Sequence, residues 1–92
     1  MAKKNYRIRG ILELFPVGSP WAYILIPDES IPDVKVGGWG SIPVIANIGN
    51  TTWQTSLFPM KGNKYFIPIK KKVRESELLQ VGKEVVVEYR VV

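Results

Sequence analysis

Apolar and charged positions alternate over residues Asn5–Leu14. One parity carries apolar side chains and a glycine, and the other carries charges: Tyr6, Ile8, Gly10, Leu12 and Leu14 against Arg7, Arg9 and Glu13. Because successive side chains of a strand point to opposite faces, this period predicts a half-buried strand. A glycine inside a strand indicates a bend or a close approach of another backbone, and we expect one of these at Gly10.

Five further segments have the composition of strands: Trp21–Ile26, Ser41–Ile48, Thr51–Phe58, Lys64–Ile69 and Glu84–Val92. The first of them is apolar at every position, which predicts a central strand covered on both faces. The pair Gly49-Asn50 predicts a two-residue type II′ hairpin turn, and Gly62-Asn63 repeats the turn signal.

Only Lys70–Leu79 has a helical pattern, with Val73, Leu78 and Leu79 near one face, and it is long enough for one or two turns. Gly82 fits the left-handed position that ends a helix or forms a tight turn. Six strands, one short helix and regularly spaced turns predict an all-β fold, with residues 1–92 as one domain. We expect a closed barrel, because closure hides the edges that so small a sheet would expose.

The chain contains no cysteine and no histidine. This excludes disulfides, thiolate nucleophiles and Cys/His zinc sites, and it removes the side chain most used for proton transfer near neutral pH. The eight acidic residues are scattered, and no serine has a histidine to activate it. The sequence therefore predicts a protein that is not an enzyme and has neither a metal nor a cofactor.

Thirteen Lys and Arg against eight Asp and Glu give a net charge of +5. A basic balance of this size favours contact with polyanions, although lysines that only keep the protein soluble explain it equally. No apolar run approaches the roughly 20 residues that cross a bilayer, and Tyr6–Leu14 does not have the apolar core of a signal peptide. We therefore expect a cytoplasmic protein without membrane contact.

Four stretches carry a resemblance to a known family: Trp21–Pro27, Thr55–Pro59, Gly62–Arg74 and Gly82–Val87. They resemble a bacterial and archaeal family of unknown function, whose members are small β-barrels sometimes fused to a bacteriocin-protection-like (YdeI/OmpD-associated) domain. The resemblance implies a six-stranded barrel of the double-split kind and no established activity. Lys83 departs from it, since the family has Asp there. Phe66–Val87 is also similar, more weakly, to the swapped-hairpin barrels of AbrB and MazE-type regulators.

Four residues are candidates for a binding site: Trp39, Lys70, Lys72 and Arg74. The lysines and Arg74 form the densest basic cluster, suited to phosphate contacts, although they equally fit the solvated face of a short helix. The resemblance implies a role for Arg74, and an ion pair with a strand carboxylate such as Glu88 is the alternative. Trp39 lies in a Gly-rich loop, where it is harder to bury than a tryptophan on a strand.

Two functions stay open. The first is a non-catalytic barrel module that binds a small ligand or a partner protein, with the loop over residues 28–40, Trp39 and Arg74 near its opening. The second is a nucleic-acid-binding or antitoxin-like regulator that uses the Lys70–Arg74 cluster. Both monomer and dimer fit the sequence.

Overall fold

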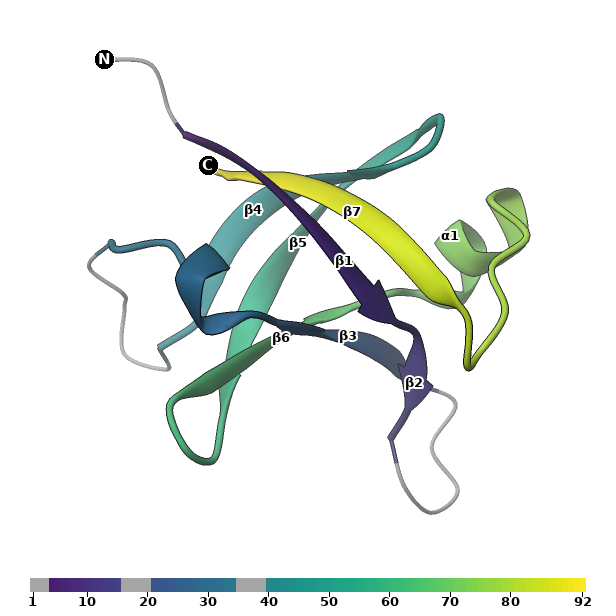
Figure 1. Cartoon of the computed structure of the whole chain (residues 1–92). Coiled ribbons are helices and arrows are strands. Elements are labelled where there is room, and N and C mark those ends of the chain that lie inside the picture. The colour runs from purple at the N-terminus through teal and green to yellow at the C-terminus, as the bar shows by residue number, and fades with distance from the viewer. Residues whose placement is uncertain (1–3, 16–20, 35–39) are drawn as a thin grey trace.

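The computed structural model describes residues 4–15, 21–34 and 40–92. Its seven strands are β1 (Asn5–Ile11), β2 (Glu13–Leu14), β3 (Ala22–Ile26), β4 (Ile42–Ile48), β5 (Thr51–Met60), β6 (Lys64–Pro68) and β7 (Glu84–Val91). A 3₁₀ turn, η1 (Asp28–Ser30), follows β3, and the helix α1 (Lys71–Ser76) follows β6 (Figure 1). The predicted all-β class with one short helix is confirmed.

The strands form one antiparallel sheet in the order β1-β7-β4-β5-β6-β3-β2. The sheet curls into a half-barrel, with β3 and β6 below, β4 and β7 above, and β5 running from the upper level to the lower one (Figure 1). The hairpin of β4 and β5 pairs Ile48 with Thr51, so its loop is the two-residue turn that the sequence predicts. Gly49 has a φ of +56°, as a type II′ turn requires at its first central position.

The prediction of a closed six-stranded barrel is wrong. The strand expected over 5–14 is split at Leu12, so that β1 pairs with β7 and β2 pairs with β3. Leu12 itself leaves both ladders: its N–H donates to the Lys83 carbonyl and its own carbonyl accepts from Gly82 N–H. Within the described ranges no ladder joins β1 to β3. The sheet therefore has seven strands and stays open, and the chain itself bridges its two ends.

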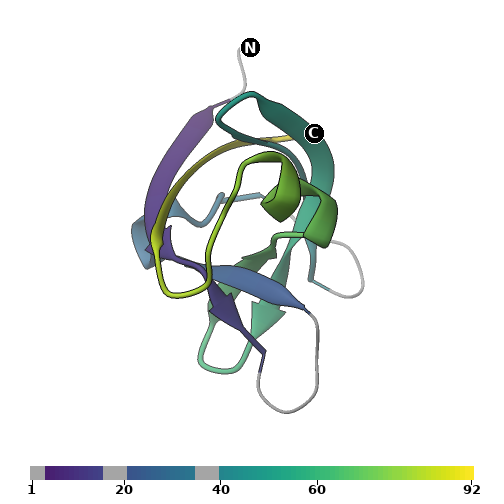
Figure 2. The ribbon, with the colours of Figure 1, turned by 90° about the vertical axis from the view of Figure 1, so that its right-hand side faces the viewer.

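The core lies inside the curl and is built from alternate residues of the strands. Its fully buried members include Leu12, Ile24, Ile42, Val44, Leu57, Ile67, Ile69, Val73 and Val87. Val73 comes from α1, which lies across one end of the curled sheet (Figure 2). The expectation that β3 is covered on both faces is wrong, because Leu25 is 43% exposed whereas Ile24 and Ile26 are buried.

Two glycines sit where a side chain would collide with the structure. A Cβ on Gly10 would lie 2.6 Å from Cγ2 of Ile24, so the close neighbour in β1 is a side chain and not the backbone that the sequence led us to expect. A Cβ on Gly49 would meet the carboxylate of Glu77. That carboxylate accepts a hydrogen bond from Thr51 Oγ1 at 2.6 Å, so the end of α1 is tied to the β4–β5 turn.

Candidate functional site

Four aromatic rings gather on the outer side of the sheet where β3, β6 and β5 run together. The rings of Phe15 and Tyr23 stack with centroids 4.4 Å apart, and Phe66 meets both edge-on, at 5.1 Å and 5.7 Å. Phe58 lies 5.8 Å from Phe66. We call these four residues together with Leu25 the aromatic face.

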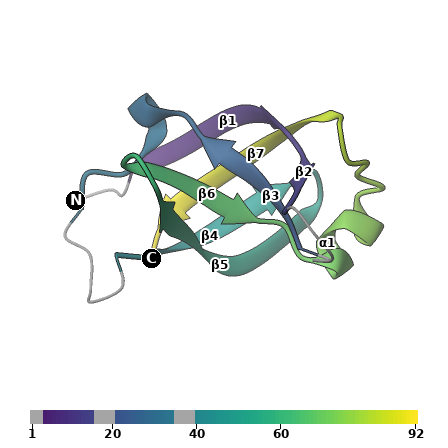
Figure 3. The ribbon, with the colours of Figure 1, turned by 90° about the horizontal axis from the view of Figure 1, so that it is seen from below.

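Strand register explains why residues from distant parts of the chain meet there. In the ladders, Phe66 is directly opposite Leu25 on one side and Phe58 on the other. Ile67, the neighbour of Phe66, points inward and is fully buried. Since side chains alternate along a strand, Phe66 must point outward, and its two partners point the same way. Figure 3 views the sheet from below and has β6 lying between β3 and β5.

The aromatic face is partly open to solvent: Phe15, Tyr23 and Phe66 are half-buried, whereas Leu25 and Phe58 are exposed. Phe58 is 40% exposed, and Met60 follows it on the same side of β5. Trp21, which is 57% exposed, precedes β3 and shares the parity of Tyr23 and Leu25. Single exposed apolar residues are ordinary, but a contiguous group of aromatic ones marks an interaction surface.

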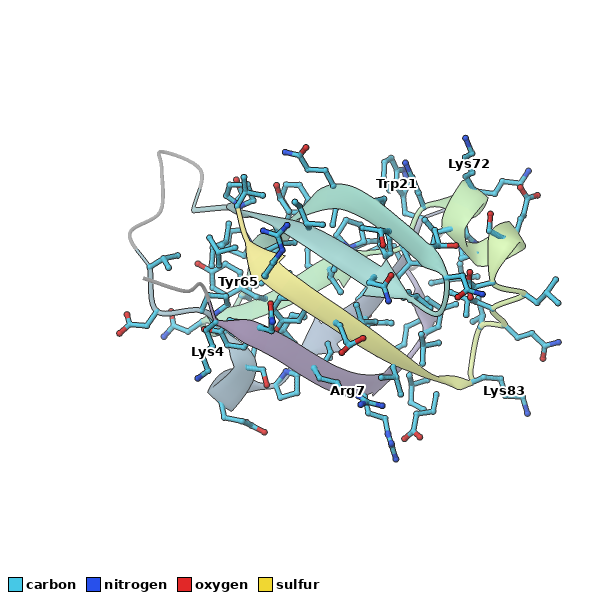
Figure 4. The ribbon with its side chains drawn as sticks, turned by 90° about the horizontal axis from the view of Figure 1, so that it is seen from above. Lys4, Arg7, Trp21, Tyr65, Lys72 and Lys83 are labelled. Carbon is cyan, nitrogen blue, oxygen red and sulfur yellow. The ribbon has the colours of Figure 1, made fainter. Side chains whose placement is uncertain are left out.

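A basic cluster adjoins this surface at the start of α1. The N–H of Ile69 donates to the carbonyl of Ala22 at 2.9 Å, and continuing this register places Lys70 beside Trp21. Lys70, Lys71 and Lys72 are all exposed. Figure 4 shows Lys72 pointing away from α1, with Trp21 on the same side of the molecule.

Arg74 occupies a different environment from the lysines. It is half-buried, and its Nε donates a hydrogen bond to the carbonyl of Ile69 at 3.1 Å. This bond holds α1 against the end of β6. Glu88, the carboxylate proposed as its partner, lies on β7 opposite Arg7 and Asn47. The structure thus brings Lys70, Lys72 and Arg74 to one short segment, and Trp39 lies outside the described residues.

The other end of the half-barrel contains a pair of stacked tyrosines. The rings of Tyr6 and Tyr89 are 5.2 Å apart and nearly parallel, and the Tyr89 hydroxyl donates to the carbonyl of Ser30 at 2.6 Å. Burial raises the pKa of Tyr89 above its ordinary value of 10.0, and the charge of Tyr6 adds to the shift. This contact anchors the η1 segment, and Tyr65 similarly bonds the carbonyl of Gly40.

Among the described residues, no group of side chains is arranged as a recognisable catalytic or metal-binding site. No three of their acidic side chains gather closely enough to hold a metal ion. A hollow of about 460 Å³ beside Tyr6 contains one carboxylate, Asp33, with Lys4, Val34 and Val91 as its other walls. The helices in this part of the chain are too short to cross a membrane.

Comparison with known proteins places the chain in a family. A family model described as a domain of unknown function, DUF1905, matches residues 9–88, which is most of the sequence. The chain belongs to the DUF1905 family. The expected membership of a family of unknown function is thereby confirmed, while the fusion partner and the AbrB/MazE likeness stay predictions. No curated protein matches this DUF1905 chain.

Sequence reasoning missed the aromatic face of this DUF1905 protein. Its residues come from four separate segments, and none of them was among the candidate residues of the sequence analysis. The sequence nonetheless indicates such a surface, because β3 has apolar side chains at its odd and at its even positions, and therefore on both faces of the strand. In a sheet with one buried side, the second apolar parity has to face solvent or a partner.

Proposed function

We propose that this DUF1905 protein is a non-catalytic binding module whose aromatic face contacts a partner protein. The observation that carries the proposal is the contiguous set of rings on the outer side of β3, β6 and β5, in which Phe58 is exposed and the other three rings are half-buried. Aromatic side chains are enriched at protein interfaces, where they contribute large contact areas. The absence of histidine and cysteine supports a role that depends on contacts rather than on reactive groups.

A protein suits this surface better than a small molecule does. Small ligands bind in concave sites that enclose most of their surface. The rings of the aromatic face stand outward from a sheet, and Phe58 and Leu25 at its two margins are about two-fifths exposed. The small-ligand hypothesis rests on Trp39 and the loop over residues 28–40, and residues 35–39 lie outside the described part of the chain.

Site-specific photo-crosslinking in the cell of origin tests the proposal. Phe58 is replaced by a photoreactive phenylalanine, and the same replacement at Leu78 serves as the control, because Leu78 is apolar, 85% exposed and on the turn after α1. We expect a discrete protein adduct from position 58 and none from position 78. No adduct from position 58, or the same adducts from both positions, would overturn the proposal.

Nucleic-acid binding is the second candidate, because Lys70, Lys71 and Lys72 lie beside the exposed Trp21. Three lysines that each neutralise one phosphate of duplex DNA predict an affinity about 40-fold lower at 200 mM than at 50 mM salt. Anisotropy of labelled duplex and single-stranded oligonucleotides measures this dependence. No anisotropy change at 50 mM salt would remove this candidate.

A further inference from the structure

We infer that the segment that covers the aromatic face is an amphipathic helix of the partner, with acidic residues at the end that meets Lys70–Lys72. This inference rests on the proposed function and adds the shape and charge of the occupant. Four observations carry it: the pairing of the strands, the dimensions of the face, the distribution of charge around it and the geometry of its rings.

Strand pairing favours a helix over an extended peptide. Along the aromatic face, β6 is paired on both sides, with β3 through Phe66 and Leu25 and with β5 through Phe66 and Phe58. A segment that lies along β6, at the centre of this surface, therefore finds no free strand edge beneath it. An extended peptide would place its own N–H and C=O groups against apolar rings without partners, whereas a helix pairs these groups internally. Packing of a helix on an apolar sheet face is also the usual way in which such a face is buried.

The dimensions of the face match a single helix. Three neighbouring strands are about 10 Å across from the first axis to the third, which is close to the diameter of a helix with its side chains. Along β6, the outward residues run from Lys64 through Phe66 and Pro68 to Lys70. This length is about 20 Å at the rise of a strand, and a helix covers it with about 13 residues.

Charge around the face is uneven, which gives the occupant a polarity. At one end the ammonium of Lys64 lies 3.1 Å from a carboxylate oxygen of Asp28, so its charge is already paired. At the other end, none of Lys70, Lys71 and Lys72 forms a salt bridge with the described residues. The nearest carboxylates by register and sequence are those of Glu13, which lies on β2 opposite Tyr23 of β3, and of Glu75 on α1. Acidic side chains on the helix would therefore be attracted to the α1 end.

The ring geometry favours a polypeptide over stacked bases. Phe15 and Tyr23 stack on each other with an interplanar angle of 28°, and Phe66 presents its ring at 79° and 71° to them. The flat faces that bases need are thus partly covered by neighbouring rings. Apolar side chains of a helix need only apolar contacts, which the exposed side chains of Phe58 and Leu25 on the two sides of Phe66 offer.

A displayed library tests the inference. It presents 16-residue peptides with random sequences to the full DUF1905 chain and is counter-selected against the Phe58→Ser variant. We expect enriched peptides to place apolar residues at helical spacing (i, i+3, i+4, i+7), with Asp and Glu near one end. Enrichment of alternating apolar and polar residues, of basic peptides or of no peptides overturns the inference.

One enriched peptide is then synthesised and titrated against the wild type and four purified variants, with circular dichroism to check that each is folded. Relative to the wild type, we expect at least tenfold weaker binding to Phe58→Ser and to Leu25→Ser, because each removes an apolar contact. The double reversal Lys70→Glu/Lys72→Glu should weaken binding at least fivefold at low salt and less at high salt. Leu78→Ser, the matched exposed control, should bind unchanged. Equal binding to all these proteins would overturn the inference.

The two proposals fail in different ways. An adduct from position 58 whose partner segment is extended or basic leaves the proposed function intact and overturns the helix. The helix is also overturned if an oligonucleotide binds the chain, loses affinity with Phe58→Ser and does not displace the peptide. In that case the oligonucleotide occupies the aromatic face and the peptide binds elsewhere. No adduct from position 58 overturns the proposed function itself.

Discussion

Replacing Gly10 with alanine tests how closely β1 approaches β3. The new Cβ would lie 2.6 Å from Cγ2 of Ile24, whereas non-bonded carbons rest about 3.5–4.0 Å apart, so the two atoms must separate by about 1 Å. Ile24 is fully buried, and its branched Cβ allows few rotamers, so it cannot turn away. Overpacking of this kind costs about 1–3 kcal/mol.

Alanine gains about 0.5–1 kcal/mol over glycine from the smaller entropy of the unfolded chain. The net expectation for Gly10→Ala is therefore a loss of about 1–2 kcal/mol in the free energy of unfolding. For a domain of this size, the loss corresponds to a Tm lower by roughly 5–15 °C. Urea unfolding followed by tryptophan fluorescence measures the change, with the buried Trp53 as a reporter.

A double-mutant cycle separates this contact from a general effect of the substitution. Leucine has no methyl group on Cβ, so Ile24→Leu removes the atom that Gly10→Ala strikes, at a cost below about 1.5 kcal/mol by itself. Gly10→Ala should then cost much less in the Ile24→Leu background. Gly62→Ala is the control: its φ of +79° disfavours alanine, nothing lies within 4 Å, and its cost should not depend on residue 24. An unchanged cost of Gly10→Ala in both backgrounds would refute the reasoning.

Three further substitutions test contacts at the two ends of the half-barrel by urea unfolding. Tyr89 keeps its proton in the folded state above the ordinary pKa of 10.0, where the unfolded chain releases it, so stability should fall as the pH rises above 10. Tyr89→Phe should lose about 1 kcal/mol near neutral pH and flatten this decline; an equally steep decline would contradict the assignment. Thr51→Val removes the hydrogen bond to Glu77 and should cost about 1 kcal/mol, with no further loss when Glu77→Ala is added. Arg74→Met keeps the aliphatic stem but loses the bond to the Ile69 carbonyl, and should cost about 1 kcal/mol. Lys72→Met, at an exposed position of α1, should stay within about 0.5 kcal/mol of the wild type, and an equal loss in the two variants would contradict a specific role for Arg74.

Local chemistry made most elements predictable. The β-branched and aromatic composition of residues 84–92 specified β7, and the pair Gly49-Asn50 specified the turn between β4 and β5, because both signals depend on a few neighbouring residues. The helix was expected over 70–79 and is shorter, since α1 ends at Ser76 and Leu78 adopts a φ of +55°. Element ends depend on capping contacts that residue patterns specify only weakly.

Closure of the sheet and the position of the aromatic face depend on pairing between distant strands. Whether the β1–β7 ladder continues past Ile11 is decided by the loop before β7, where the N–H of Gly82, some 70 positions along the chain, donates to the Leu12 carbonyl. Likewise, Phe58 and Leu25 meet on opposite sides of Phe66 only through the registers of two separate ladders. A slip of one residue would turn Phe66 into the core, so no local pattern locates this site.

The seat of the Glu77 carboxylate against Gly49 has an evolutionary consequence. A side chain at 49 would displace this carboxylate from its place beside the turn, and with it the hydrogen bond from Thr51. Across DUF1905 sequences we expect these two columns to covary, with glycine at 49 accompanying a long acidic residue at 77 and bulkier residues at 49 accompanying alanine or serine at 77. A phylogeny of the family would then show how often the contact between α1 and the β4–β5 hairpin has been lost and regained.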